Sequence, residues 1–127
     1  MKKKGKDTLR EINQYAEGML FIKDISKLEF IEPIVSEVVG NFGKLDILVN
    51  NAHASKQAPF VETTQEMFDL SLNTGFYPTF NFMKAAYSEL KNSKGKVIIS
   101  LQVLAYLVSR HKHLMRQRKR QFVQLHV

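Results

Sequence analysis

The strongest constraint on the fold is a ten-residue segment near the middle of the chain, residues 43–52, with the sequence GKLDILVNNA. Residues 45–49 are almost entirely apolar, which is typical of a strand buried on both faces of a parallel sheet. This run ends at two asparagines, Asn50 and Asn51. Because ligands of open α/β sheets bind beyond the carboxyl ends of the strands, the polar residues there are the first candidates for a functional site.

The rest of the pattern alternates between helices and strands. Apolar residues recur with helical spacing over residues 7–16, 26–42 and 63–91, and the last stretch is interrupted near Gly75 and Pro78. Short apolar runs that predict buried strands occupy residues 19–22, 45–49 and 96–100. A helix–strand alternation of this kind predicts an α/β fold in which helices cover a parallel sheet.

Local signals predict where the helices begin. Ser26, with Glu29 three residues later, has the spacing of a capping box. Pro33 is unfavourable inside a helix, so it predicts either a kink or a later start. Thr63 or Thr64 can cap the helix that follows the loop over residues 54–62.

Charge divides the chain near residue 100. The net charge is +7, yet residues 1–100 carry 13 basic and 12 acidic side chains, whereas residues 101–127 carry six basic side chains and no acidic one. We therefore expect two parts, a body over residues 1–100 and a basic tail over residues 101–127. A charge run usually forms a solvated helix face, but this tail could also bind phosphates or an anionic membrane surface.

Composition narrows the class of protein. A chain of 127 residues has room for one small domain. No apolar run approaches the roughly 20 residues of a membrane span, and no leader sequence is recognisable, so we expect a soluble, cytoplasmic protein. The sequence contains no cysteine, which excludes disulfides and thiolate metal sites.

Segment 43–52, together with Asn73 in the segment LSLNTGF (residues 70–76), closely resembles the short-chain dehydrogenase/reductase family. The resemblance covers roughly residues 7–100. It implies a partial Rossmann-like, doubly wound parallel sheet with flanking helices, containing about three of the family's seven strands. The intact enzymes transfer a hydride between NAD or NADP and a small carbonyl or alcohol substrate. The long helix of residues 73–91 resembles one that pairs subunits in relatives, which implies a homo-oligomer.

The resemblance assigns roles to residues on both predicted strand ends. Asp24 and Ile25 follow the first predicted strand, where an acidic residue contacts the adenine edge of the cofactor in this family. On spacing alone, Asp24 is equally well a turn residue. Asn73 matches the helix asparagine that holds a water connected to the catalytic lysine, which makes it the best catalytic candidate in the chain.

The second predicted strand end would lie near the nicotinamide ribose. The resemblance assigns cofactor contacts to Asn50, Asn51, Ala52 and His53. An isolated asparagine pair is usually a turn, and the preceding strand is what favours the family interpretation. The family usually has glycine where this chain has His53, so a side chain there could crowd the ribose. As a lone histidine it also fits an ordinary loop residue, without a second ligand at metal spacing.

Two parts of the family's machinery have no counterpart in this sequence. The glycines stand at positions 5, 18, 40, 43, 75 and 95, so none forms a phosphate-binding Gly-rich loop between a strand and a helix. Gln102 stands where the catalytic serine is expected, and Tyr106 is followed four residues later by Arg110 rather than lysine. By position, Met1 falls after the family's second strand. We therefore expect this polypeptide to be inactive by itself.

The tail permits a reading in another frame. In this frame, each triplet consists of the last base of one codon and the first two bases of the next. Such triplets can encode a serine across codons 102 and 103, a tyrosine across codons 114 and 115, and a lysine across codons 118 and 119. This gives the family's serine and Tyr-x-x-x-Lys signature in nearly the expected register, although codon degeneracy permits these residues without requiring them. The hypothesis is a frameshift near codons 99–101. The alternative from a different class is a non-catalytic interaction protein that uses the long helix or the basic tail.

Overall fold

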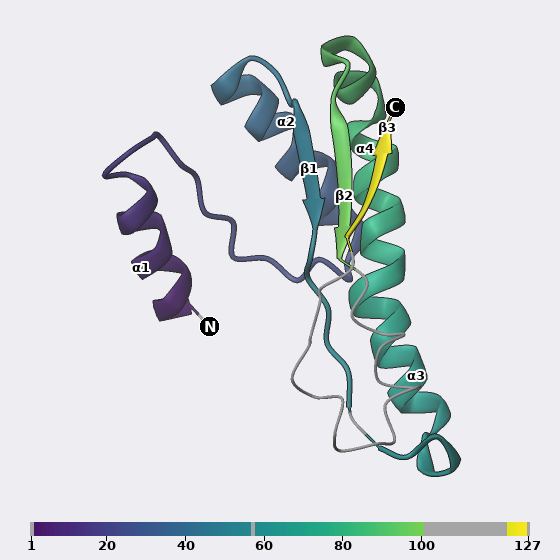
Figure 1. Cartoon of the computed structure of the whole chain (residues 1–127). Coiled ribbons are helices and arrows are strands. Elements are labelled where there is room, and N and C mark those ends of the chain that lie inside the picture. The colour runs from purple at the N-terminus through teal and green to yellow at the C-terminus, as the bar shows by residue number, and fades with distance from the viewer. Residues whose placement is uncertain (1, 57, 101–121, 127) are drawn as a thin grey trace.

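A three-stranded sheet with helices on one face organises the computed structural model, which describes residues 2–56, 58–100 and 122–126 (Figure 1). The strand order is β1-β2-β3, with bounds Ile47–Asn50, Lys96–Ser100 and Phe122–His126. Strands β1 and β2 are parallel, with Leu48 opposite Val97. The α/β class and both parallel strands are therefore confirmed. β2 has the predicted bounds, and β1 begins two residues later than predicted.

Strand β3 was not predicted. It pairs antiparallel with β2 and places Gln124 opposite Ile98. The sheet therefore mixes parallel and antiparallel pairing, whereas the sequence led us to expect a purely parallel sheet. The residues that form β3 belong to the segment assigned to the basic tail. Residues 101–121 of that segment lie outside the described part of the chain.

Helices α2 and α4 lie on the covered face, where they pack against each other and α4 contacts both β1 and β2 (Figure 1). Helix α2 spans Ile31–Phe42 and follows a short 3₁₀ turn, η1, over Leu28–Phe30. The helix therefore has the later start that Pro33 predicts. A second 3₁₀ turn, η2 (Phe60–Glu62), precedes a long helical rod.

The helical rod is built from three consecutive elements. Helix α3 (Gln65–Ser71) leads into a π-helical turn, η3 (Leu72–Phe76), which continues as α4 (Tyr77–Ser93). The side chain of Thr64 accepts a hydrogen bond from the backbone N–H of Met67, which confirms Thr64 as the capping residue. The predicted interruption near Gly75 is confirmed as the π-helical turn, and the chain stays helical through it.

The core lies between the helices and the sheet. Its buried side chains are Val35 of α2, Ala86 and Leu90 of α4, and Val97 of β2. Half-buried Leu48 of β1 packs against the same cluster. Because α2 and α4 both cover this face, the opposite face of β1 has no cover among the described residues. Ile47 and Val49 there are each 55% exposed.

The predicted strand over residues 19–22 is wrong: these residues form neither a strand nor a helix. A strand requires a neighbour that supplies hydrogen bonds, and within the described ranges β1 pairs with β2 alone. This segment turns instead toward helix α1 (Lys2–Ile12), where the Leu20 side chain lies against Gly5. Helix α1 therefore begins five residues before the predicted helix of residues 7–16.

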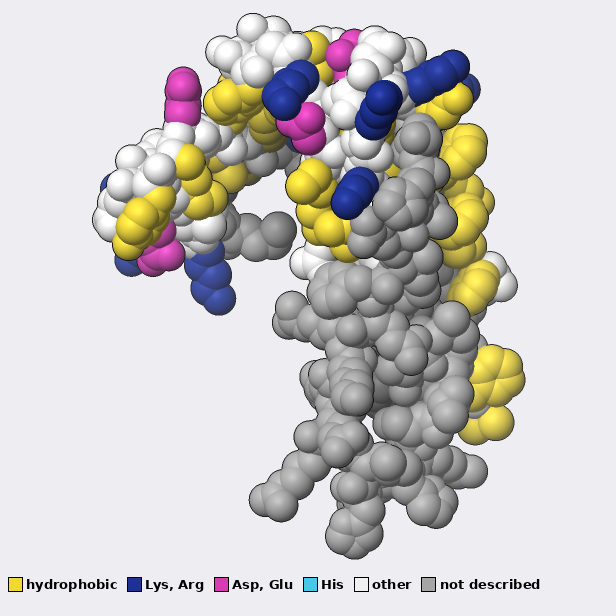
Figure 2. All heavy atoms as spheres, turned by 45° about the horizontal axis from the view of Figure 1, so that its top comes forward, with side chains coloured by type: hydrophobic (Ala, Val, Ile, Leu, Met, Phe, Trp, Pro, Cys, Tyr) yellow, Lys and Arg dark blue, Asp and Glu magenta, His cyan; other side chains and the backbone are white. Residues whose placement is uncertain are grey.

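Surface composition varies around the molecule (Figure 2). Hydrophobic side chains gather along the edge where the helical rod lies, and the exposed aromatic residues of this rod are Phe68, Phe76, Tyr77, Phe80 and Tyr87. Among the described residues, no helix is both long enough and apolar enough to cross a bilayer.

Candidate functional site

The carboxyl end of β1 opens onto a pocket of about 240 Å³. Its wall on one side is the end of β1 and the following loop, from Leu48 to Ala52, and on the other side the start of α4. Ile25, three residues after the segment 19–22, also lines the pocket. The structure thus brings together four predicted site residues: Ile25, Asn50, Asn51 and Ala52.

Asp24, the neighbour of Ile25, is exposed and held in a local turn. Its Oδ1 accepts hydrogen bonds from the Ser26 hydroxyl at 2.7 Å and from the Ser26 backbone N–H at 3.1 Å. The predicted capping box at Ser26 is therefore wrong, because Ser26 donates to Asp24 instead of capping a helix. Lys27 precedes η1, and its side chain makes no capping hydrogen bond. The geometry is that of the turn interpretation of Asp24, and it leaves Oδ2 without a hydrogen bond among the described residues.

These contacts lower the pKa of Asp24 below its ordinary value, mainly through the Ser26 hydroxyl, then through the Ser26 N–H, with a smaller contribution from the charge of Lys27. The turn is therefore stabilised above the ordinary carboxyl pKa, and this contribution is lost as the pH falls through the lowered value. We expect Ser26→Ala to raise the pKa of Asp24 toward its ordinary value, as measured by NMR titration of the carboxyl group.

The matched control for this titration is Ser36→Ala, at an exposed position inside α2. It should leave the Asp24 titration unchanged. If Asp24 titrates identically in the Ser26→Ala protein and in the unaltered chain, the hydroxyl contact does not form.

Asn50 is the last residue of β1 and lies half-buried. Its Nδ2 atom is buried and has no hydrogen-bond partner among the described residues. An unpaired buried amide is costly, so such groups usually mark a bound water, a ligand contact or a functional constraint. Asn51 and Ala52 follow with exposed side chains. The end of β1 therefore has one buried donor without a partner, Nδ2 of Asn50, and one polar side chain that is exposed to solvent, that of Asn51.

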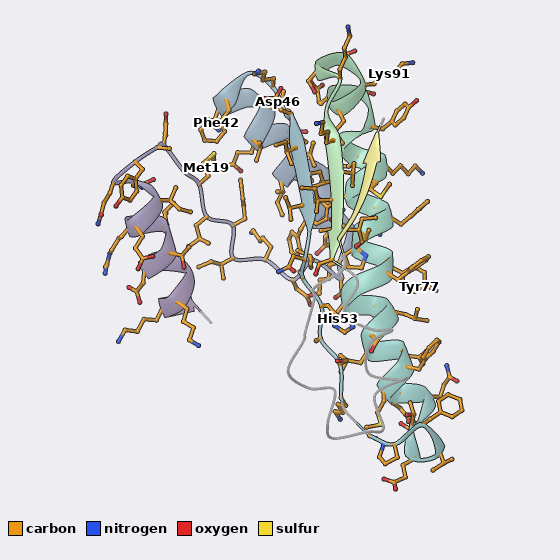
Figure 3. The ribbon with its side chains drawn as sticks, in the orientation of Figure 1. Met19, Phe42, Asp46, His53, Tyr77 and Lys91 are labelled. Atoms are coloured by element: carbon orange, nitrogen blue, oxygen red, sulfur yellow. The ribbon has the colours of Figure 1, made fainter. Side chains whose placement is uncertain are left out.

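The loop after β1 is hydrogen-bonded to the helical rod. The Thr74 hydroxyl accepts a hydrogen bond from the Ala54 N–H at 3.0 Å, and it lies 3.0 Å from the Ala54 carbonyl oxygen and 2.7 Å from that of Leu70. His53 precedes this contact and lies on the rod side of the loop (Figure 3). Its ring packs over Gly75, so that a Cβ atom built on Gly75 would stand 2.8 Å from Cδ2 of His53.

The structure does not bring Asn73 into this group. Its side chain is exposed, it does not line the pocket, and it makes no hydrogen bond among the described residues. Sequence reasoning missed Thr74, Gly75 and Thr79, which contact the loop or line the pocket. The interruption near Gly75 was the available signal for this region. It could not reveal which residues of the turn face the loop, because a π-helical turn changes their angular positions.

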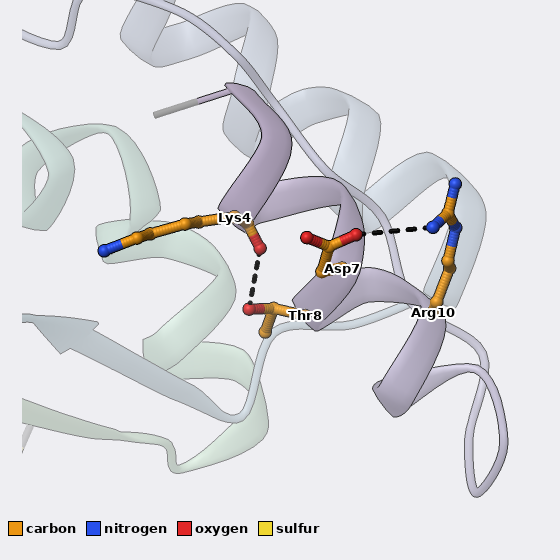
Figure 4. A network of polar contacts seen from close by, with 4 residues as sticks. All are labelled: Lys4, Asp7, Thr8 and Arg10. Atoms are coloured by element: carbon orange, nitrogen blue, oxygen red, sulfur yellow. Dashed lines mark hydrogen bonds and ion pairs between the residues drawn. The ribbon is translucent and has the colours of Figure 1, made fainter.

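Other polar clusters are local. On α1, Thr8 donates to the Lys4 carbonyl at 3.0 Å, and Arg10 pairs with Asp7 at 3.3 Å (Figure 4). These exposed contacts lie within one helix and support its early start. Within residues 2–56, 58–100 and 122–126, no three His, Asp or Glu side chains gather so as to hold a metal ion.

The sequence matches the family described as Enoyl-(Acyl carrier protein) reductase over residues 1–126. It is 39% identical to a 12alpha-hydroxysteroid dehydrogenase from Clostridium sp. over 69 residues, which are 54% of this chain and 27% of that protein. It is 35% identical to an uncharacterized oxidoreductase from Thermotoga maritima over 106 residues, which are 83% of this chain and 41% of that protein.

Solved structures agree with the sequence matches. A dehydrogenase/reductase from Sinorhizobium meliloti superposes with a TM-score of 0.64 at 31% identity, over 70% of this chain and 36% of that one. An alcohol dehydrogenase from Thermococcus sibiricus, complexed with 5-hydroxy-NADP, gives a TM-score of 0.61 at 26% identity, over 74% and 39%. The chain therefore spans less than half the length of these relatives.

Proposed function

Because the chain belongs to the short-chain dehydrogenase/reductase family, we propose that it is the central segment of an NAD(P)-dependent oxidoreductase and is inactive as it stands. The observation that carries this proposal is the pocket at the carboxyl end of β1, which gathers Ile25, Asn50, Asn51 and Ala52. In the intact enzyme, a hydride would pass between the nicotinamide and a hydroxyl or carbonyl group of a small substrate.

The residues present fit part of a dinucleotide. Asp24 and Ile25 would contact the adenine end, and Asn51 and Ala52 would face the ribose next to the nicotinamide. The pocket of about 240 Å³ is smaller than the roughly 300–1,000 Å³ typical of small-molecule sites. The sequence also provides no Gly-rich loop for the pyrophosphate. These residues would therefore orient portions of a cofactor that bound mainly elsewhere.

The proton-transfer groups are the second reason to propose inactivity. After position 102, where the family's serine is expected, the sequence has no Tyr-x-x-x-Lys pair, which in the family supplies the proton and holds the ribose. Tyr87 and Lys91 have this spacing, but they lie on α4, before that position. Asn73 remains a proposed site residue on its sequence match alone, since it lies apart from the pocket. The substrate class is proposed from the relatives, whose names include 12alpha-hydroxysteroid dehydrogenase and L-fucose dehydrogenase.

Steady-state assays test this proposal. The purified chain is incubated with NAD⁺ or NADP⁺ and hydroxysteroids or sugars, and separately with the reduced cofactors and ketones. We expect no nicotinamide absorbance change above that of a heat-denatured sample. Sustained turnover that follows chain concentration through gel filtration would overturn the inactivity.

We also propose that residues 101–127 are translated out of frame, so that the in-frame family body ends near residue 100. Support comes from the charge break at that point and from the codons permitted in the adjacent frame. The family match continues through residue 126, so it does not separate the tail from the body. The nucleotide sequence is therefore the observation that decides whether the tail is out of frame. Triplets that forbid the tyrosine or lysine would end the frameshift proposal.

Self-association is a further part of the proposal. The exposed aromatic side chains Phe76, Tyr77, Phe80 and Tyr87 all lie on η3 and α4, the segment that would pair subunits. The alternative function, a non-catalytic interaction protein, would use this same face or the basic tail. Sedimentation velocity across chain concentrations distinguishes them: a concentration-dependent dimer supports subunit pairing, whereas a monomer with salt-sensitive binding to anionic partners supports the alternative.

A further inference from the structure

Strand β1 has one free edge. Its inner edge pairs with β2, and no described residue pairs with its outer edge. On the face that α2 and α4 leave bare, Ile47 and Val49 are each 55% exposed. The N–H and C=O groups along an unpaired edge form a template for another strand, and apolar side chains beside them are stabilised when they are removed from water. The outer edge of β1 is therefore suited to an apolar segment that can become a strand.

Residues 19–22, here called the strap, have the composition that such an edge accepts. The sequence of the strap is MLFI, so all four side chains are apolar, and phenylalanine and isoleucine are favoured in strands. Leu20 is 38% exposed and Ile22 is 46% exposed. Among the described residues, the strap makes no hydrogen bond to another part of the backbone. The strap therefore has apolar side chains that are not buried and backbone groups that are not paired.

The chain brings the strap to the correct side of the sheet. In Figure 1, β1 is the edge strand that faces α1, and the segment between α1 and η1 lies on that side. This segment already meets β1 at one point, because Ile25 lines the pocket together with Asn50 and Asn51. The three steps from Ile22 to Ile25 span at most about 11 Å. A strap that ran along the edge toward Ile25 would have the same direction as β1 and would pair with it in parallel.

The connection between the strap and β1 has the form that parallel pairing requires. Parallel strands need a crossover of about a dozen residues or more, usually with a helix. Residues 23–46 supply it, since they contain η1 and α2, and α2 packs against α4 on the covered face. Ile31 at the start of α2 is 0% exposed, so this crossover is anchored in the open arrangement. Pairing of the strap would therefore move only the part of the chain before Ile25.

The part that would move is held together by its own contacts. Cδ1 of Leu20 lies 3.2 Å from the position where a Gly5 Cβ would stand. Gly18 lies against Ile12 in the same way, at 3.0 Å, and its N–H donates to Oδ1 of Asn13 at 3.0 Å. These contacts join the strap to α1 and to the turn between them. Helix α1 and the strap can consequently move as one unit, with these contacts kept.

From these observations we propose that the strap exchanges between the open position described above and a closed position, in which it pairs in parallel with the outer edge of β1 as a fourth strand. Closure gives hydrogen-bond partners to two sets of backbone groups that have none in the open position. It also holds Ile25 against the pocket at the end of β1, so that this part of the pocket wall becomes continuous with the sheet. This inference does not depend on the proposed oxidoreductase function.

Disulfide trapping tests the closed position. The chain contains no cysteine, so two introduced cysteines are its only thiols. The variants are Phe21→Cys/Val49→Cys and Ile22→Cys/Val49→Cys. Successive strand side chains point to opposite faces, so one variant places both thiols on the same face of the closed sheet. In a glutathione redox buffer, we expect that variant to form an intramolecular disulfide at least about tenfold faster than the other, because only neighbouring Cβ atoms can be bridged.

The matched controls place the second cysteine on α4, as Phe21→Cys/Tyr87→Cys and Ile22→Cys/Tyr87→Cys. Tyr87 is 53% exposed and Val49 is 55% exposed, so the two thiols are similarly accessible. Peptide mass mapping of the gel-filtered monomer measures the disulfide. Rates no faster with Val49→Cys than with Tyr87→Cys would overturn the strap. A disulfide found only between two chains would overturn it as well, and would show that β1 pairs with a second copy.

Proline substitutions separate strand pairing from simple proximity. Met19→Pro and Leu20→Pro are each added to the variant that forms the disulfide. Successive N–H groups of a strand point to opposite sides, so one of the two prolines removes a donor directed at β1. That proline should slow disulfide formation about fivefold, which is the effect of one ordinary hydrogen bond on an equilibrium, and the other should slow it less. If neither proline slows the reaction, the strap does not pair as a strand.

Discussion

Replacing Leu90 with alanine is expected to lower the free energy of unfolding by about 3 kcal/mol, because this side chain is buried against α2 and β2. Leu90 is 1% exposed and packs in one cluster with Val35, Ala86 and Val97. So small a core cannot refill the cavity from neighbouring side chains. Urea unfolding followed by far-ultraviolet circular dichroism measures the change as a lowered midpoint at constant slope.

The control for this substitution is Leu28→Ala. Leu28 lies in the 3₁₀ turn η1 and is 62% exposed, so the same loss of atoms should change the free energy of unfolding by less than about 0.5 kcal/mol. Similar losses for the two variants would contradict the packing of α4 against the sheet.

Replacing Gly95 with alanine is expected to cost about 2–3 kcal/mol through overpacking. Gly95 joins α4 to β2, and a Cβ there would stand 2.6 Å from the Asp46 carbonyl oxygen and 2.8 Å from Cδ2 of Leu90. The backbone cannot move away freely, because the Gly95 N–H donates to the Leu90 carbonyl at 2.7 Å and the Lys96 backbone N–H donates to the Asp46 carbonyl at 2.9 Å. Thermal unfolding should show the loss as a lower midpoint.

Gly40→Ala provides the matched control, since a Cβ at that position in α2 meets nothing within 4 Å. Inside a helix, alanine is favoured over glycine by up to about 1 kcal/mol, so this variant should be stabilised. Opposite signs for the two substitutions would confirm the close contact of α4 with the strand ends. Stabilisation by both would mean that the α4–β2 junction is wrong.

Signals that depend on neighbouring residues predicted the fold well. The apolar run of β2 and the capping threonine of α3 were both identified from residues adjacent in sequence. Residues 19–22 carried an equally strong apolar signal, yet they form no strand. Strand formation depends on a partner elsewhere in the chain, and a single run of residues cannot report whether one is present.

The candidate site, like the fold, could be predicted only where its residues are adjacent in the sequence. Asn50, Asn51 and Ala52 stand at the end of an apolar run in the sequence, and all three line the pocket. That run also predicts a strand buried on both faces, which is wrong, because Ile47 and Val49 are exposed. The contacts of the loop with Thr74 and Gly75 join residues about twenty positions apart, so no local pattern could indicate them. Asn73 was chosen because it matches the family, but its side chain is exposed. Its neighbours in the π-helical turn, Thr74 and Gly75, contact the loop instead.

The bare face of β1 bears on how long the chain persists in a cell. Ile47 and Val49 present apolar side chains, and the outer edge of this strand has no partner within the described ranges. Unpaired edges and uncovered apolar strands are surfaces that chaperones and proteases recognise and that other chains can join. At a given rate of synthesis, the steady-state abundance of the polypeptide would then depend on the competition between degradation and capture by a covering partner.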